Sequence, residues 1–262
     1  MEVQHNMQAL NANRMLGMTQ GLQAKATEKL SSGYRINRAA DDAAGLSISE
    51  KMRRQIRGLT QASLNAQEGI SMVQAAEGAL TEVHDMLQRM SELAVKAETG
   101  TLATADRSYI NQEVTQLKAE IDRIATDTTF NEKTLLDGNL GQVDIHVDTE
   151  AGKYISFTIG SMKCADLTVQ GTTDTAANAG TLNGQVKTAI EKVSNQRSLL
   201  GAVQNRLEHT VNNLDNVAEN TQAAESQIRD TDMATEMVKY SNNNILAQAG
   251  QAMLAQSNQA NQ

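Results

Sequence analysis

The chain has 262 residues, of which 40% are hydrophobic but only 2% aromatic, with no Pro, no Trp and a net charge of −8. Because Pro interrupts helices and large aromatic side chains fill thick cores, this composition favours long helices packed over thin seams. The negative charge argues against a nucleic-acid-binding protein, which needs a concentrated basic surface. No apolar run approaches the roughly 20 residues of a membrane span, so we expect neither a nucleic-acid nor a membrane partner.

The two ends of the chain, residues 1–37 and 228–262, are rich in Asn, Gln, Ala and Met and carry only thin apolar stripes. Isolated helices with so little apolar surface are marginal, so we expect both ends to fold only against another surface. A calmodulin-target or membrane-surface helix is the alternative, which the few flanking basic residues disfavour. The stripe residues are Met7, Leu10, Leu22, Ala26 and Leu30, then Met233, Met237, Tyr240, Ile245, Ala249 and Met253.

A short loop, residues 31–37, precedes the first long helix. Asp41 and Asp42 follow it, where a helix N-terminus favours negative charge and a capping oxygen, and this position predicts a helix over residues 42–98. Within this predicted helix, apolar residues recur at alternating spacings of three and four, which is typical of a heptad seam. They are Val73, Ala76, Leu80, Val83, Leu87, Met90 and Ala94.

Two further helices are predicted over residues 104–126 and from about residue 182 to residue 221 or beyond. The first has apolar residues at the same spacings, and the second has an apolar residue every seven positions. Arg197 and Gln204 interrupt a second row of the last helix, a cost in stability usually explained by register. The two rows are Ile110, Val114, Leu117, Ile121 and Ile124, and Val193, Leu200, Leu207 and Leu214.

In the middle of the chain, apolar residues recur at every second position. Val143, Ile145 and Val147 precede Gly152, and Ile155 and Phe157 follow it, which predicts a β-hairpin. Residues 172–184 are small and polar and are predicted to form a loop. The predicted fold is therefore mainly α, a long antiparallel helical coiled-coil or bundle rod with a small β-hairpin region.

No motif in the chain supports catalysis or metal binding. The four His residues are scattered, and no paired Cys and His spacing or nucleotide-binding glycine motif occurs. Cys164 is the single cysteine, which excludes an internal disulfide, and we expect it to be a small packing residue near a strand. We therefore expect no enzyme, no catalytic residue, no cofactor and no metal.

Two long segments of the chain resemble the conserved ends of bacterial flagellin, the subunit of the flagellar filament. They are KLSSGYRINRAADDAAGLSISEKM, from Lys29, and LGAVQNRLEHTVNNLDNVAENTQAAESQIRDTDMATEMVKYSNNNILAQAGQAMLAQSNQ, from Leu200. The resemblance covers roughly residues 1–138 and 182–259. Only about forty residues lie between the two parts, so the chain resembles a minimal, core-only flagellin.

The resemblance implies a discontinuous inner-core domain, residues 1–42 plus 222–262, and an outer-core domain, residues 43–221, with the β-hairpin and loop at 140–181. It implies a self-assembling structural protein for motility, secreted into the extracellular filament. The implied partners are other copies of the chain, an export chaperone at the C-terminal region, the flagellar type III export apparatus, hook-associated proteins and the filament cap. The N-terminus lacks the plan of a secretory signal peptide, which agrees with that route.

The resemblance also implies a receptor site. Gln88-Arg89-Met90-Ser91-Glu92-Leu93-Ala94-Val95 resembles the flagellin segment that Toll-like receptor 5 of animal hosts recognises. Ser91 replaces the basic residue commonly found there, which lowers the expected strength of recognition. The alternative is that these side chains are the seam of a helix and its solvated flank. The implied receptor-binding residues are Gln88, Arg89, Glu92, Leu93 and Glu113.

Flagellins commonly finish with an apolar tail, whereas this sequence stops at Asn261 and Gln262. Without the tail, we expect the pairing of the two ends to rest on the thin stripes around Leu10, Leu22, Ile245 and Met253. We also expect assembly to be weaker than in a chain extended by such a tail. The alternatives to flagellin are a hook–filament junction protein of the same apparatus, a coiled-coil signalling protein and, last, an enzyme.

Overall fold

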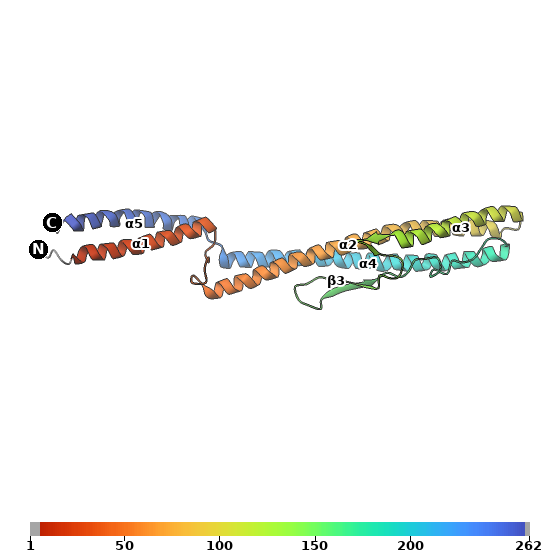
Figure 1. Cartoon of the computed structure of the whole chain (residues 1–262), viewed down its shortest axis with the longest axis horizontal. Helices are drawn as coiled ribbons and strands as arrows, with labels where there is room; N and C mark the ends of the chain where they lie inside the picture. Colours follow the sequence, from red (N-terminus) through yellow and green to blue (C-terminus); the bar gives the residue numbers. More distant parts are fainter. Residues whose placement is uncertain (1–5, 260–262) are drawn as a thin grey trace. The chain divides into compact units, whose positions relative to one another are not determined.

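The computed structural model describes residues 6–259, so the predicted effect of an apolar tail beyond Asn261 and Gln262 lies outside the described residues. In this part of the chain there are five helices, α1 (Met7–Ser32), α2 (Ala43–Glu98), α3 (Thr104–Asp127), α4 (Ala176–Arg229) and α5 (Met233–Gln259) (Figure 1). Between α3 and α4 lie the strands β1 (Thr129–Phe130), β2 (Lys133–Thr134), β3 (Gln142–His146) and β4 (Tyr154–Thr158). The mainly α fold with a small β region is confirmed.

The chain forms two compact units. The central unit is residues 58–217, and the terminal unit joins the described residues up to 57 with those from 218 onward. The predicted division at residues 42 and 222 concerns assembly, and stays a prediction.

The central unit is held by the predicted heptad seam. Its helical segments run antiparallel, because Ser63 Oγ donates to Asp215 Oδ1 at 2.8 Å and, further along α2, Ser91 Oγ donates to Asn183 Oδ1 at 3.1 Å. All seven seam residues predicted on α2, from Val73 to Ala94, are fully buried. On α4, the side chains of Val193, Leu200, Leu207 and Leu214 are buried as well, so both rows are confirmed.

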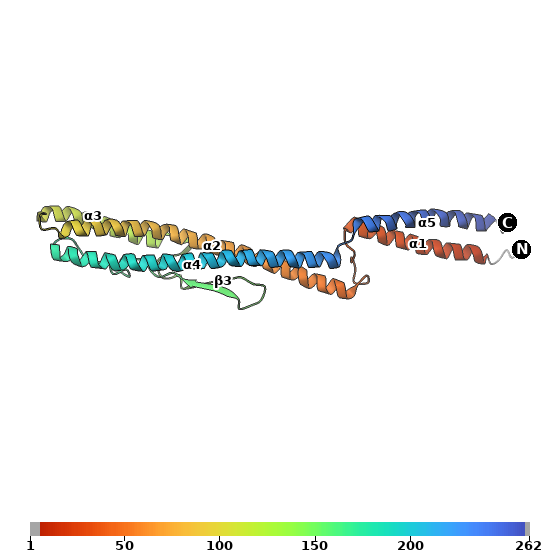
Figure 2. The same ribbon diagram turned by 180° about the vertical axis from the view of Figure 1, so that it is seen from behind.

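The predicted β-hairpin is also confirmed. β3 and β4 pair antiparallel, with Ile145 opposite Ile155 and Val143 opposite Phe157. Figure 2 labels β3 in this hairpin. Ile145 packs so closely on Gly69 of α2 that a Cβ there would collide with its side chain. A second, unpredicted hairpin joins β1 to β2 through Asn131 and Glu132, which both have positive φ, the geometry of a tight two-residue turn.

The predicted loop over residues 172–184 is wrong from residue 176 onward, because α4 begins at Ala176. Thr175 provides the start signal: its Oγ1 accepts a hydrogen bond from the Asn178 N–H at 3.2 Å, as an N-cap does. The small residues that follow suit a helix because Ala has the highest helix propensity, and Ala179 and Leu182 are fully buried.

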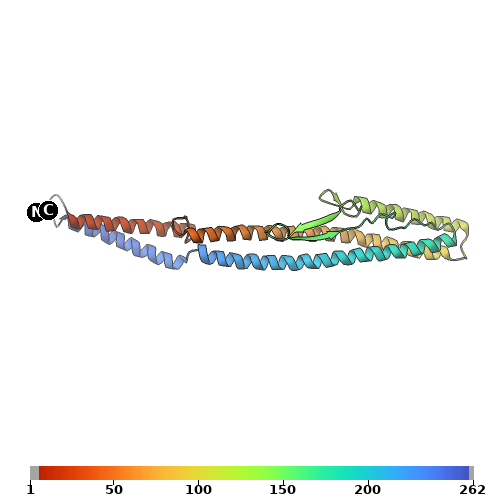
Figure 3. The same ribbon diagram turned by 90° about the horizontal axis from the view of Figure 1, so that it is seen from below.

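In the terminal unit, α1 and α5 lie side by side (Figure 3). Ala26 and Ala247 are buried, and the Cδ1 atom of Leu16 lies 3.3 Å from the position of a Cβ on Gly250. Of the predicted stripes, Ala26 is buried, whereas Leu10, Leu22, Ile245 and Met253 are 56–68% exposed. Small residues permit a close approach of the two backbones, and that approach turns the larger apolar side chains outward.

The loop after α1 joins the two chain ends of this unit. Gly33 ends α1 with a φ of 76°, and its carbonyl accepts a hydrogen bond from the Thr231 N–H at 2.9 Å. The Arg35 N–H donates to the Arg229 carbonyl at 2.6 Å, and the Arg229 guanidinium lies 4.6 Å from the centre of the Tyr34 ring. The same guanidinium lies 3.1 Å from Glu50, so one side chain ties the loop, α2 and α4 together.

The predicted cap of α2 is confirmed. Asp42 Oδ1 accepts a hydrogen bond from the Gly45 N–H at 2.9 Å, which satisfies one of the free donors of the first turn. Asp41 points elsewhere, since its Oδ2 accepts from the N–H groups of Asn37 and Arg38 at 3.2 and 3.0 Å. The two carboxylates therefore close the loop and start the helix, and do not form an acid–base pair.

Candidate functional site

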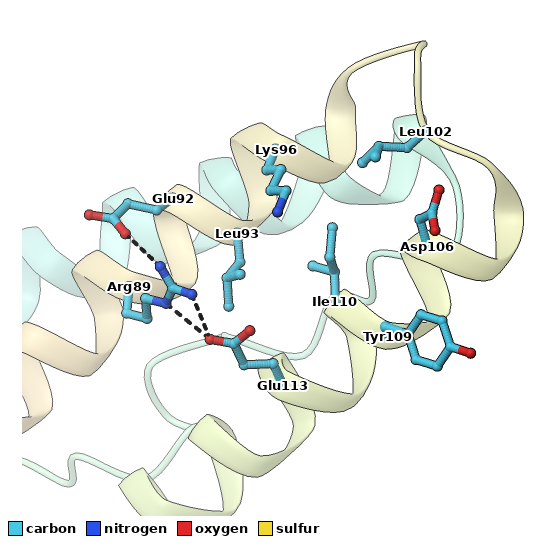
Figure 4. Close-up of a pocket in the computed structure, with 9 residues that line it drawn as sticks. All are labelled: Arg89, Glu92, Leu93, Lys96, Leu102, Asp106, Tyr109, Ile110 and Glu113. Carbon is cyan, nitrogen blue, oxygen red and sulfur yellow. Dashed lines mark hydrogen bonds and ion pairs between the residues drawn. The ribbon is translucent and has the colours of Figure 1, made fainter.

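Arg89 lies at the centre of the predicted receptor site. Its Nη2 atom lies 2.9 Å from Glu113 Oε1, its Nε donates to the same oxygen at 3.0 Å, and its Nη1 lies 3.1 Å from Glu92 Oε2 (Figure 4). These bonds, first those of Glu113, raise the pKa of the guanidinium above its ordinary value. Arg89 and Glu92 come from α2 and Glu113 from α3, so the ion pairs hold the guanidinium between two helices. About half of the Arg89 side chain still faces solvent.

The ion pairs border a groove between α2 and α3, with a volume of about 550 Å³. Buried Leu93 and Ile110 form its apolar base, and the exposed Tyr109 ring points outward from its edge (Figure 4). We refer to it as the α2–α3 groove. Its nine lining residues are Arg89, Glu92, Leu93, Lys96, Leu102, Asp106, Tyr109, Ile110 and Glu113.

Four of the five predicted receptor-binding residues lie together in this groove, and Gln88 does not. Its side-chain Nε2 lies 2.8 Å from Nε2 of His84, one turn away on α2. With Ser91 and Ile190 it lines a separate hollow of about 530 Å³. Ser91 hydrogen-bonds to Asn183 on α4, so this position contributes to helix packing as well as to the surface.

Sequence reasoning missed Lys96, Leu102, Asp106 and Tyr109. An available signal was Tyr109, one of four Tyr residues in a chain that is poor in aromatic residues. It lies four positions before Glu113 on the predicted helix, and residues four apart share a helix face. The other three depend on the turn between α2 and α3, which local periodicity does not determine.

The described residues offer little chemistry beyond binding. Within residues 6–259 no group of three or more His, Cys, Asp or Glu side chains is placed to hold a metal ion. Cys164 is buried, as predicted for a packing residue, and burial, followed by the nearby Asp122 carboxylate, raises the pKa of its thiol to about 12. A thiol with this pKa is a poor nucleophile, because the thiolate is the reactive form. None of the described helices is long and apolar enough to cross a membrane.

A second candidate surface covers α1 and α5. Large apolar side chains on both helices are 47–69% exposed, although the two helices already pack on each other. So many exposed large apolar side chains on two neighbouring helices make these helices a candidate protein–protein contact. We refer to it as the terminal apolar surface; it consists of Met7, Leu10, Met15, Met18, Leu22, Met233, Met237, Val238, Ile245, Leu246 and Met253.

Two family descriptions match this chain. The bacterial flagellin N-terminal helical region matches residues 3–140, and the bacterial flagellin C-terminal helical region matches residues 184–262. Together they include every predicted receptor-binding residue and, among the described residues, both helices of the terminal apolar surface. The α2–α3 groove lies wholly within the first region.

Individual proteins are similar over nearly the whole chain. A flagellin of Halalkalibacterium halodurans is 51% identical, over 99% of this chain and 96% of its own length. A flagellar filament 31.3 kDa core protein of Treponema maltophilum is 48% identical, over 98% of this chain and 96% of its own. The crystal structure of Bacillus cereus flagellin is 29% identical, with a TM-score of 0.53, and covers 58% of this chain and 88% of that one.

Proposed function

The chain belongs to the bacterial flagellin family, and on this premise we propose that it builds the flagellar filament by polymerising through the terminal apolar surface. The family consists of structural proteins, and a subunit of the filament acts outside the cell. The match to flagellin regions at both ends does not favour the hook–filament junction alternative.

The exposure of the terminal apolar surface supports this route of assembly. Val238, Ile245 and Leu246 are more than half exposed on α5, and Leu10 and Leu22 are equally exposed on α1. Covering each such side chain stabilises a contact by about 1.5–3 kcal/mol. Contacts between different faces of identical subunits produce an open helical filament where the rotation from one subunit to the next does not close into a ring.

Electron microscopy of the purified chain after salt-induced assembly tests the proposal. We expect long filaments from the unchanged protein and none from a Leu10→Gln, Ile245→Gln double variant, because both changes place a polar group in the contact. The matched control is Leu199→Gln, which makes the same change at a 62% exposed position of the central unit. Rings or short stubs from the unchanged chain would favour the junction alternative, and filaments from the double variant would place the contact elsewhere.

The remaining partners follow from the same premise. We expect export through the flagellar type III apparatus, a cytosolic chaperone that covers the apolar side chains of α5 before export, and contacts with hook-associated proteins and the filament cap. An apolar surface that must remain unpaired until assembly explains why a chaperone is needed.

The second proposed function is recognition of the monomer by Toll-like receptor 5 at the α2–α3 groove. The geometry of Arg89 supports it, because Glu92 and Glu113 orient a half-exposed guanidinium at the border of a groove with an apolar base. Arg residues that are already oriented are common interface hot spots. The flank of this site carries Ser91 hydrogen-bonded to Asn183, so the basic contact common at this position is absent.

Receptor binding by an Arg89→Ala variant tests this second function. We expect the dissociation constant to rise by about tenfold, since a truncated Arg hot spot costs at least one factor of ten. The matched control is Arg123→Ala, because Arg123 is equally exposed on α3 and also pairs with two carboxylates, Glu120 and Asp127. Equal affinity of the unchanged protein and the Arg89 variant would refute the assignment.

A further inference from the structure

The methionines of the described chain divide sharply between the two units. Six of them lie on α1 and α5 and are 47–69% exposed, whereas Met72, Met90 and Met162 of the central unit are at most 8% exposed. Met52 and Met86 are intermediate. The six exposed residues are Met7, Met15, Met18, Met233, Met237 and Met253.

The six side chains leave 47–69% of their surface exposed outside the α1–α5 pair. The pair packs through small residues such as Ala26 and Ala247, and through Leu16 beside Gly250. Met15 and Met253 instead line an outward hollow of about 540 Å³ between the helices. A chemical change at these thioethers therefore alters the surface that a second subunit meets, without entering either core.

We propose that these six methionines are an oxidation site that stops the free subunit from polymerising. The inference rests on the proposed assembly through the terminal apolar surface. The modifying agent is a two-electron oxidant such as hydrogen peroxide. The sulfur lone pair attacks one peroxide oxygen, the O–O bond breaks, the sulfur becomes a sulfoxide, and the second oxygen leaves as water.

The sulfoxide acts through polarity. It replaces a flexible apolar group by a polar one, and a buried polar group without a hydrogen-bond partner opposes association. Cys164 does not compete for the oxidant, because it is buried in the central unit. A polymer that covers α1 and α5 also covers these thioethers, so the oxidation site is open before assembly and closed after it.

The test treats purified monomer and preformed filaments with hydrogen peroxide and measures oxidation by peptide mass spectrometry. In the monomer we expect the six residues to oxidise well before Met72, Met90 and Met162, and in filaments we expect them to be protected. The critical concentration of the oxidised monomer rises by about tenfold or more, since each covered side chain contributes about one factor of ten. The unfolding midpoint of the central unit does not change, and methionine sulfoxide reductase restores polymerisation.

Two variants separate the sites. Replacing the six exposed methionines by Leu removes the effect of peroxide, because Leu is similar in size and does not oxidise. The control replaces the three buried methionines by Leu and remains sensitive. If the sixfold variant assembles poorly before treatment, a Met15→Leu, Met253→Leu variant with reduced sensitivity supports the proposal instead.

The outcomes distinguish the two proposals. Failure of the untreated, unchanged chain to polymerise contradicts the proposed function. Normal polymerisation of a chain whose six methionines are fully oxidised, or equal peroxide sensitivity of the unchanged chain and the sixfold Met→Leu variant, overturns the oxidation site alone.

Discussion

The central and terminal units are both helical but bury very different amounts of apolar surface. In the central unit, Leu, Val, Ile and Met side chains from α2, α3 and α4 form one continuous core. In the described part of the terminal unit, the buried apolar side chains are Ala26, Ile36 and Ala247. Since burial of apolar area is the main favourable term in folding, the central unit stabilises itself, whereas the terminal unit exposes apolar groups that another subunit covers.

The largest expected effect concerns the accessibility of sulfur. Cys164 has a thiol pKa raised to about 12, so its thiolate fraction at pH 8 is about a thousandfold smaller than in the unfolded chain. We therefore expect its alkylation to be much slower in the folded protein. A Met15→Cys variant provides an exposed thiol in the terminal unit and is expected to react at the unfolded rate. Timed labelling with iodoacetamide and mass spectrometry measures both rates. Rapid labelling of Cys164 in the folded protein would show that its thiol is accessible to water and reagent, contrary to its burial in the structure.

The next effect concerns the seam. Leu207→Ala is expected to lower the free energy of unfolding by about 2–5 kcal/mol, because a fully buried Leu loses its packing and leaves a cavity. Leu199→Ala makes the same change at an exposed position of α4 and is expected to cost less than about 0.5 kcal/mol. Chemical denaturation of the monomer measures both, and equal midpoints would place Leu207 outside the seam.

A smaller effect is expected where the terminal unit depends on polar contacts. Arg229→Ala removes the cation above Tyr34 and leaves Glu225, which is 13% exposed, without its basic neighbour. The local cost is about 1–2 kcal/mol, as for a largely desolvated cation–π contact. Hydrogen exchange at the amides of Arg35 and Thr231 should accelerate, while the exposed Arg14→Ala change leaves both unaffected. Unchanged exchange would mean that the backbone bonds alone hold the loop.

The smallest effect concerns the cap of α2. Asp42→Ala removes the acceptor for the Gly45 N–H and is expected to cost about 1 kcal/mol. Asp42→Ser keeps a capping oxygen and is expected to restore most of it. The midpoints of thermal unfolding of the unchanged protein and the two variants measure this effect. Identical midpoints of the Ala and Ser variants would show that the capping hydrogen bond does not stabilise α2.

Local periodicity predicted the seam well because the spacing of Val73, Leu80 and Leu87 already places them on one face of a helix. It failed for residues 176–184, where Thr175 and the alanines after it carry a weaker signal than an apolar row. It also failed for the second hairpin, since Asn131 and Glu132 are not a common turn pair.

The residues of the candidate sites could be predicted less well from the spacing of residues along the sequence. Arg89 and Glu113 are 24 positions apart, and their ion pair exists only because the turn between α2 and α3 returns one helix along the other. The resemblance to flagellin indicated both residues, but no spacing rule joins them. The groove base at Leu93 and the edge at Tyr109 were likewise decided by packing.

The sequence by itself determined the helical class, the heptad seam, the hairpin and the family, because composition and period act along the chain and survive without tertiary contacts. Only the tertiary structure decided which face of each end is covered. On α1 and α5 the small residues Ala26, Ala247 and Gly250 permit close approach, and the larger apolar side chains turn outward. The physical reason is that a stripe specifies which residues are apolar, whereas the closest packing of two backbones selects the face that is buried.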